Sequence, residues 1–93
     1  MWYTYILQCS DSSFYVGRAN DLSERVNRHN AGRAARWTAR RLPVKLIYNE
    51  AFATEEQAAN RERQIKKWSR DKKQALITVD KTTLKELSRC KTK

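Results

Sequence analysis

The stretch that decides the fold is WYTYILQCSDSSFYVGR, residues 2–18. Its first part, Trp2 to Cys9, is rich in tyrosine, threonine, isoleucine and leucine, a composition typical of a β-strand. The run from Ser10 to Ser13 is a turn by composition, and Phe14 to Arg18 is predicted to form a second strand. Because the connection is this short, the two strands are expected to form an antiparallel hairpin that ends at Gly17.

A helix is predicted to follow the hairpin. Asp21 has the character of a helix N-cap, and Glu24 stands three residues later in the capping-box position. Leu22 and Val26 supply the apolar stripe that faces the core. Gly32 is then a C-terminal stop, because glycine readily adopts the left-handed conformation that ends many helices.

The middle of the chain is expected to hold a loop and a third strand. The stretch 32–42 is rich in arginine and is predicted to be a loop with a short helical turn, broken by Pro43. Val44 to Phe52 is predicted to form the third strand. Thr54 and Gln57 form a second capping box, which opens a helix of about four turns.

The C-terminal third is predicted to be helical. The helix after Thr54 should reach about Trp68, and Ser69 is placed to cap a further helix through Ile77. Asp80 or Thr83 is expected to start a short last helix. The element order β-β-α-β-α-α predicts an α+β fold, a small, mostly antiparallel, three-stranded sheet flanked by helices.

Length and composition restrict the class of protein. The 93 residues suit one domain, which we expect to span 1–79, followed by a basic, frayed helical tail over 80–93. No apolar run approaches the ~18 residues that span a bilayer, and no secretory signal is visible, so the expected compartment is the cytoplasm. Cys9 and Cys90 have no metal-binding spacing and are expected to be reduced thiols.

The charge balance indicates a polyanionic partner. Twenty Lys and Arg residues against ten Asp and Glu residues give a net charge of +10. All of the basic residues follow Gly17. Such a balance on a small domain favours nucleic acid over a basic surface kept only for solubility. A membrane partner is not expected, because no long basic stripe carries bulky apolar anchors. A protein partner cannot be read from the sequence.

Several short motifs occur in a fixed order along the chain. Tyr3-Thr4-Tyr5 lies on the first strand and Tyr15-Val16-Gly17 on the second, with Arg25 and His29 on the following helix and Glu62 on the later one. This ordered set resembles the GIY-YIG nuclease superfamily, and within it the short standalone UPF0213-like proteins. The resemblance covers about residues 2–77. Tyr3 and Thr4 stand where the first motif has glycine and isoleucine.

The resemblance implies a catalytic site and its chemistry. Tyr5 or Tyr15 would activate or orient a water molecule, and Arg25 would neutralise the attacked phosphate. Glu62 would bind one divalent metal ion, magnesium or else manganese, and His29 matches a position often found in the site. Phosphodiester hydrolysis needs such charge stabilisation, a metal ion and a group that handles a proton. The expected function is therefore metal-dependent hydrolysis of nucleic acid, DNA first, directed by structure rather than by base sequence. A non-catalytic nucleic-acid-binding module is the alternative.

Each of these residues also has a structural interpretation. The tyrosines could be half-buried packing residues, and His29 a hydrogen-bonded structural residue. Arg25 lies one helical turn before His29 and could clamp a phosphate or pair with a neighbouring carboxylate. Glu62 shares an apolar helix face with Ala58 and Ile65, where a carboxylate must be ion-paired, for instance with Arg25, or bound to metal.

A second group of residues is predicted to contact the nucleic acid. The group combines basic side chains, suited to phosphate, with an aromatic ring on which an exposed base could stack. Its members are Arg18, Arg28, Arg36, Trp37, Arg40, Arg41 and Lys66.

Overall fold

The computed structural model describes residues 1–79 and has the predicted α+β architecture. A three-stranded antiparallel sheet has the order β2-β1-β3, with β1 spanning Trp2–Gln8, β2 Phe14–Ala19 and β3 Lys45–Phe52. The predicted strands are confirmed, with ends that differ by one residue, a normal spread for hydrogen-bond assignment. The hairpin does not end at Gly17 as predicted, because β2 stays paired with β1 through Ala19. The predicted last helix from Asp80 or Thr83, and Cys90, lie outside the described residues.

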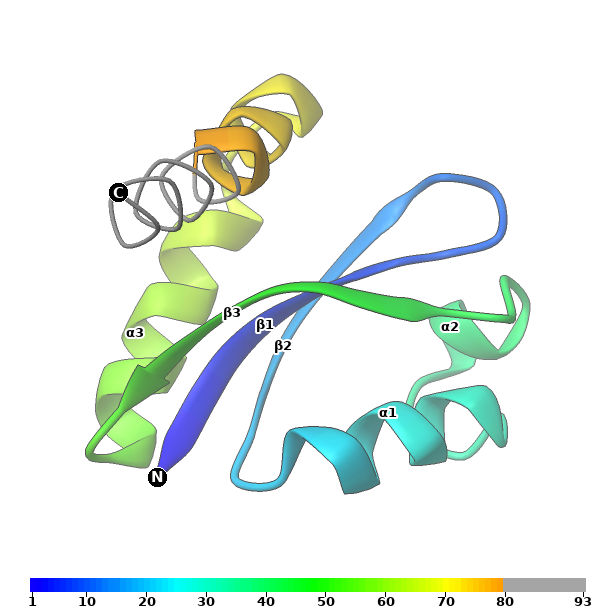
Figure 1. Cartoon of the computed structure of the whole chain (residues 1–93), viewed down its shortest axis with the longest axis horizontal. Helices are drawn as coiled ribbons and strands as arrows, with labels where there is room; N and C mark the ends of the chain where they lie inside the picture. The colour runs from blue at the N-terminus through cyan, green and yellow to red at the C-terminus, as the bar shows by residue number, and fades with distance from the viewer. Residues whose placement is uncertain (80–93) are drawn as a thin grey trace, which may run out of the picture.

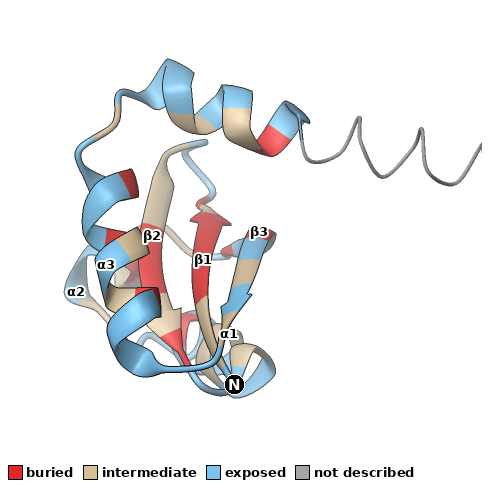
Figure 2. Cartoon of the chain, turned by 90° about the vertical axis from the view of Figure 1, so that its left-hand side faces the viewer, coloured by how far each residue is buried: buried red, intermediate tan, exposed pale blue. Residues whose placement is uncertain are grey.

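Helices cover both faces of the sheet (Figure 1). The helices α1, Leu22–Asn30, and α2, Arg36–Ala39, lie against one face, and α3, Glu55–Lys66, lies against the other. Residues 70–79 form a further helix beyond α3. Four consecutive residues of β1, 4–7, are buried, because the central strand has helices on both sides (Figure 2).

The two faces of β1 carry separate core clusters. Tyr5 and Leu7 pack with the α1 side, whereas Ile6 packs with Ile65 of α3 and with Ile77. The hydroxyl of Thr4 donates to the Ala58 carbonyl oxygen at 2.7 Å, which ties the strand to α3. The alternation of a β-strand therefore sends Tyr5 and its neighbours to opposite sides of the sheet.

The helix boundaries follow their capping residues. The Thr54–Gln57 capping box is complete in α3, as predicted, and Ser69 Oγ accepts from the Lys72 backbone N–H at 3.2 Å. Asp21 accepts from the Glu24 backbone N–H at 3.0 Å. The Glu24 carboxylate does not complete that capping box and instead pairs with Arg28 at 2.7 Å.

The hairpin turn and the helix stop also match the prediction. Asp11 accepts from the backbone N–H of Ser13 at 3.0 Å, which closes the turn between β1 and β2. Gly32 has φ of 74°, the left-handed conformation expected after α1. Within residues 1–79, no helix is long and apolar enough to cross a membrane.

Candidate active site

A concave pocket of about 280 Å³ opens along the edge strand β2. It lies where the two helical layers meet the same strand, so side chains from both faces of the sheet reach it. Its lining residues are Trp2, Tyr5, Tyr15, Gly17, Arg18, Arg25, Glu55 and Glu62. The sheet thus brings together four of the five predicted catalytic residues, Tyr5, Tyr15, Arg25 and Glu62.

The two tyrosines share the α1 face of the hairpin. Tyr5 pairs with Gly17 across the strands, and Tyr15 lies on the diagonal, with the ring centroids 6.5 Å apart. The Tyr5 phenol lies directly over Gly17, because a β-carbon there would stand 2.6 Å from the Tyr5 hydroxyl oxygen. Glycine is therefore required by this close approach, which lets Tyr5 reach the pocket.

We expect Gly17→Ala to displace the Tyr5 phenol. The added methyl carbon would also lie 2.7 Å from Tyr5 Cζ. Tyr5 is only 1% exposed and tightly packed, so its ring has to move. Overpacking of this kind costs ~1–3 kcal/mol, measurable as a lower free energy of unfolding in urea. In a double-mutant cycle with Tyr5→Leu, the two losses should be less than additive. Full additivity would contradict the steric explanation.

His29 is buried behind the tyrosines and does not line the pocket. It is 1% exposed, and its Nε2 lies 3.0 Å from the Tyr5 hydroxyl oxygen. Its Nδ1 lies 2.8 Å from Thr38 Oγ1 of α2. The ring of Tyr15 packs edge-on against the imidazole at 5.0 Å. His29 therefore contacts two residues of the pocket lining, Tyr5 and Tyr15, without lining the pocket itself.

The environment keeps both Tyr5 and His29 neutral near pH 7. Burial, followed by the nearby phenol of Tyr15, raises the pKa of Tyr5 to about 12, and the lowering effect of Arg25 is smaller. Desolvation outweighs the cationic neighbour Arg25, so the Tyr5 phenol is a weaker acid than a free tyrosine. Burial and then the charge of Arg25 lower the pKa of His29 below 6.5.

The buried imidazole should make folding sensitive to mildly acidic pH. The unfolded chain takes up a proton near pH 6.5, whereas the folded ring, facing Tyr5, Tyr15 and Arg25, resists it. The stabilisation is therefore full above pH 6.5 and is lost as the pH falls through the lowered folded value. Urea unfolding of the wild type should show this loss between pH 7 and 5, and His29→Asn should show much less of it. An unchanged wild-type stability across that range would contradict the assignment.

Arg25 reaches the pocket from α1 with donors to spare. Its Nη1 makes one long hydrogen bond, 3.4 Å, to the Arg18 carbonyl oxygen. Its Nε is buried and has no hydrogen-bond partner among residues 1–79. No described ion pair joins it to Asp21 or Glu24, the neighbouring carboxylates of its own helix. A guanidinium with unused donors in a concave site is suited to an anion.

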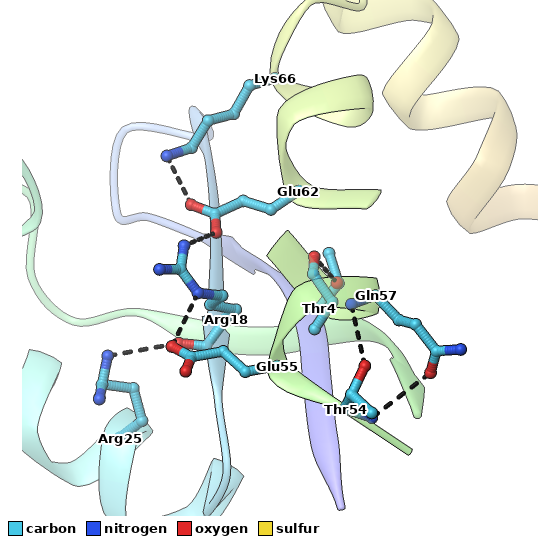
Figure 3. Close-up of polar contacts among 9 residues, drawn as sticks. Thr4, Arg18, Arg25, Thr54, Glu55, Gln57, Glu62 and Lys66 are labelled. Atoms are coloured by element: carbon cyan, nitrogen blue, oxygen red, sulfur yellow. Dashed lines mark hydrogen bonds and ion pairs between the residues drawn. The ribbon is translucent and has the colours of Figure 1, made fainter. Parts of the chain in front are cut away.

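Glu62 is the carboxylate on the other side of the strand. It is 7% exposed and lies on the inward face of α3 with Ala58 and Ile65, as the helical spacing predicted. Its Oε1 accepts from Arg18 at 2.7 Å and its Oε2 from Lys66 at 2.6 Å (Figure 3). The ion pair expected for a buried Glu62 thus forms with Arg18 and Lys66 rather than with Arg25.

Two opposing effects set the ionisation of Glu62. Burial is the largest single influence and raises its pKa, but the hydrogen bonds from Lys66 and Arg18 together lower it below 4.5. The carboxylate is therefore charged at neutral pH. Arg18 also pairs with Glu55 at 3.4 Å, so one guanidinium bridges two carboxylates one above the other on α3.

A second hollow of about 510 Å³ lies beside α2 and the hairpin turn. Its lining combines Asp11 with four of the residues predicted to bind nucleic acid: Arg36, Trp37, Arg40 and Arg41. The Trp37 ring stacks on Tyr15 at 6.1 Å, and the Arg41 guanidinium lies 4.1 Å from the Trp37 ring centroid. Trp37 therefore connects this hollow to the first pocket through Tyr15.

The predicted binding residues differ in how free their charges are. Arg41 is paired with Asp11 at 3.2 Å and Arg28 with Glu24. Arg28 also lies in a separate hollow on the outer side of α1. Within the part of the chain that the structure describes, the side chains of Arg36 and Arg40 have no ion pair or hydrogen-bond partner. These two are the cations most available to a phosphate.

This pocket geometry agrees with a sequence match. The profile of the GIY-YIG catalytic domain matches residues 1–75. The chain belongs to the GIY-YIG family. A UPF0213 protein of Bacillus pumilus is 45% identical over 75 residues, which cover 81% of this chain and 76% of that protein. A UPF0213 protein of Haloquadratum walsbyi is 47% identical over 74 residues, covering 80% and 83%.

A solved structure of a UPF0213 relative supports the fold. The solution NMR structure of a UPF0213 protein from Bacillus halodurans is 38% identical, with a TM-score of 0.55 and 85% of each chain covered. The fold and family inferred from the sequence are therefore confirmed. The roles of individual residues remain predictions.

Sequence reasoning missed two residues of this GIY-YIG site. Glu55 lines the pocket, and its spacing of seven residues from Glu62 on α3 would have placed both on one helix face. Thr38 is 0% exposed and bonds His29. Nothing local to α2 marks that threonine, because its contact with His29 depends on how α1 and α2 pack.

Proposed function

We propose that this protein is a metal-dependent endonuclease that hydrolyses phosphodiester bonds of nucleic acid, DNA in the first place. Membership of the GIY-YIG family supports the reaction class. The observation that carries the proposal is Arg25, whose buried Nε has no described partner and which shares a pocket with two phenols and a charged carboxylate. A phosphate oxygen there would satisfy the unused donors, and charge that develops on it during hydrolysis would be stabilised.

The phenols would handle the attacking water. Tyr15 is half-buried and borders the pocket, whereas Tyr5 is buried with its hydroxyl bonded to His29. With a pKa of about 12, Tyr5 stays a neutral phenol, so it is better suited to orient a water than to act as a free phenolate. Neutral His29 is then the nearest group that can receive a proton from Tyr5.

The residues of the pocket fit a hard divalent cation. Magnesium is commonly held through one or two carboxylates, several waters and phosphate oxygens, and Glu62, with Glu55 beside it, offers such a set. Residues 1–79 contain no group of three or more His, Cys, Asp or Glu side chains that could together hold a metal ion, so waters and phosphate oxygens would complete the ligand set. A bound magnesium or manganese ion would supply charge neutralisation at the phosphate.

The basic surface would hold the strand next to the cleaved bond. Arg36 and Arg40 have no described ion pair and offer free charges. Trp37 is 39% exposed, and its ring stacks on that of Tyr15. Such cations bind phosphates irrespective of sequence. Phosphate contacts and ring stacking do not depend on base identity, so we propose that substrate choice follows nucleic-acid structure rather than base sequence.

One observation favours a non-catalytic binding module instead. Both oxygens of Glu62 already bind cations, Arg18 and Lys66, so a metal ion would have to displace them. The side chains of these cations are 40% and 51% exposed, so water can solvate them once displaced. This leaves the enzyme as the better supported proposal.

A cleavage assay distinguishes the two functions. Supercoiled plasmid and a branched DNA are incubated with the protein in magnesium, in manganese and in EDTA, while binding is measured on the same DNA. Metal-dependent nicking is the expected result. Binding without product in either metal would reject the nuclease and support the binding module.

A further inference from the structure

A chain of buried hydrogen bonds runs from α2 to the pocket. Thr38 Oγ1 lies 3.1 Å from the Ala35 carbonyl oxygen and 2.8 Å from His29 Nδ1. His29 Nε2 lies 3.0 Å from the hydroxyl oxygen of Tyr5. Tyr5, His29 and Thr38 are each at most 1% exposed, so bulk water does not compete for these contacts.

Counting the hydrogens gives the chain a direction. The Tyr5 hydroxyl has one hydrogen, and among residues 1–79 its only acceptor is His29 Nε2. A neutral imidazole that accepts at Nε2 carries its proton on Nδ1 and donates it to Thr38. The Thr38 hydroxyl then gives its own hydrogen to the Ala35 carbonyl oxygen.

The opposite direction leaves a buried donor unpaired. If Nε2 carried the proton, Tyr5 would accept it, and the Tyr5 hydrogen would have no acceptor in the described structure. A buried donor without a partner is costly. The charge of Arg25, which acts on the Tyr5 oxygen, also favours lone pairs on the Arg25 side and the hydrogen on the His29 side. Both effects favour the Nδ1–H form of His29. Thr38 adds a third, because its hydroxyl hydrogen is given to Ala35 and its oxygen can therefore only accept from Nδ1–H.

We propose that Thr38 is a positioning residue that holds His29 in its Nδ1–H tautomer, so that Tyr5 presents an acceptor to the pocket. With the other tautomer, the Tyr5 oxygen would accept from His29 and its hydrogen would point to the pocket. Tyr5 would then offer an attacking water a donor instead of an acceptor. The catalytic consequence rests on the proposed nuclease function. The tautomer itself does not, and it can be measured in the free protein.

The test uses the fact that His29 is the only histidine in the chain. Long-range ¹⁵N–¹H NMR spectra of the imidazole distinguish the protonated from the bare ring nitrogen. We expect the wild type to show the Nδ1–H form. Thr38→Val keeps the shape but removes the hydroxyl and should shift the ring to the Nε2–H form, and Thr38→Ser should restore Nδ1–H.

Cleavage by the same three proteins tests the positioning role. Partners that orient metal-ligating histidines are worth about 10–100-fold in affinity or activity, and we expect an effect of the same order for the orientation of His29. We expect Thr38→Val to lose that factor and Thr38→Ser to regain most of it. A tautomer shift in Thr38→Val with wild-type cleavage would overturn the positioning role.

The remaining outcomes are separable. An Nε2–H ring in the wild type, or an unchanged Nδ1–H ring in Thr38→Val, would overturn the inference whatever the activity. If no protein cleaves DNA, the nuclease proposal fails, and the spectra alone decide the tautomer. Should Thr38→Val not fold, an Nε2–H ring in the wild type or in Thr38→Ser would still overturn it.

Discussion

Glu62→Gln is expected to abolish metal-dependent cleavage while leaving DNA binding intact. Glutamine keeps the size of the side chain but removes the charge that would hold the divalent ion. A catalytic metal contributes several kcal/mol of charge stabilisation, and ~1.4 kcal/mol corresponds to tenfold in rate, so the loss should be about 10³-fold. DNA affinity should hold or rise, because Arg18 and Lys66 lose their carboxylate partner.

The fold should tolerate this substitution. Removing one partner of a buried ion pair is destabilising when the remaining charge stays buried. Here the remaining charges are on Arg18 and Lys66, whose side chains are 40% and 51% exposed and can be solvated by water. We therefore expect the lost activity to come with only a modest change in the free energy of unfolding.

Glu56→Gln is the matched control. It makes the same charge change on the same helix, but Glu56 is exposed and does not line the pocket. Its cleavage rate should equal that of the wild type. Equal losses in Glu62→Gln and Glu56→Gln would point to net charge rather than to a metal ligand. Full activity of Glu62→Gln would remove Glu62 from the site.

Arg25→Ala is expected to lower the cleavage rate by about 10²–10³-fold, the usual effect of removing one donor to a developing anion. The same substitution should not destabilise the protein by breaking a native pair. Among residues 1–79, Arg25 makes one long hydrogen bond, 3.4 Å, and no ion pair; it also interacts with the Tyr5 oxygen, so a modest loss of stability is compatible with the proposal. The cleavage rate should therefore fall far more than the free energy of unfolding, which would not be the case for a merely structural arginine.

Two further variants test whether the geometry and the position of the Arg25 guanidinium matter. Arg25→Lys keeps the charge but loses the planar fork, so it should recover only part of the rate. Arg33→Ala removes an exposed arginine just beyond the same helix that does not line the pocket, and it should cut at nearly the wild-type rate. Single-turnover rates of plasmid nicking measure all three. An Arg25→Ala protein that unfolds more easily and still cuts normally would show that Arg25 is structural.

The local elements of this protein follow from its sequence. The Thr54 side chain accepts from the Gln57 backbone N–H, and the Gln57 side chain accepts from the Thr54 backbone N–H. The start of α3 is therefore specified within four residues. The helical period likewise places Glu62 on the inward face of α3 with Ala58 and Ile65. The family and the residues of its motifs also follow from the order of short motifs along the chain.

The partners of the site residues were decided only by tertiary structure. Lys66 is one helical turn from Glu62 and could be read from spacing, but Arg18 reaches the carboxylate only because α3 packs against β2. Thr38 meets His29 because α2 folds back on α1, and Tyr5 becomes a weaker acid because the sheet and helices exclude water around it. Periodicity and capping are local and can be read along the chain, whereas ion pairing, tautomer and desolvation depend on which segments pack together.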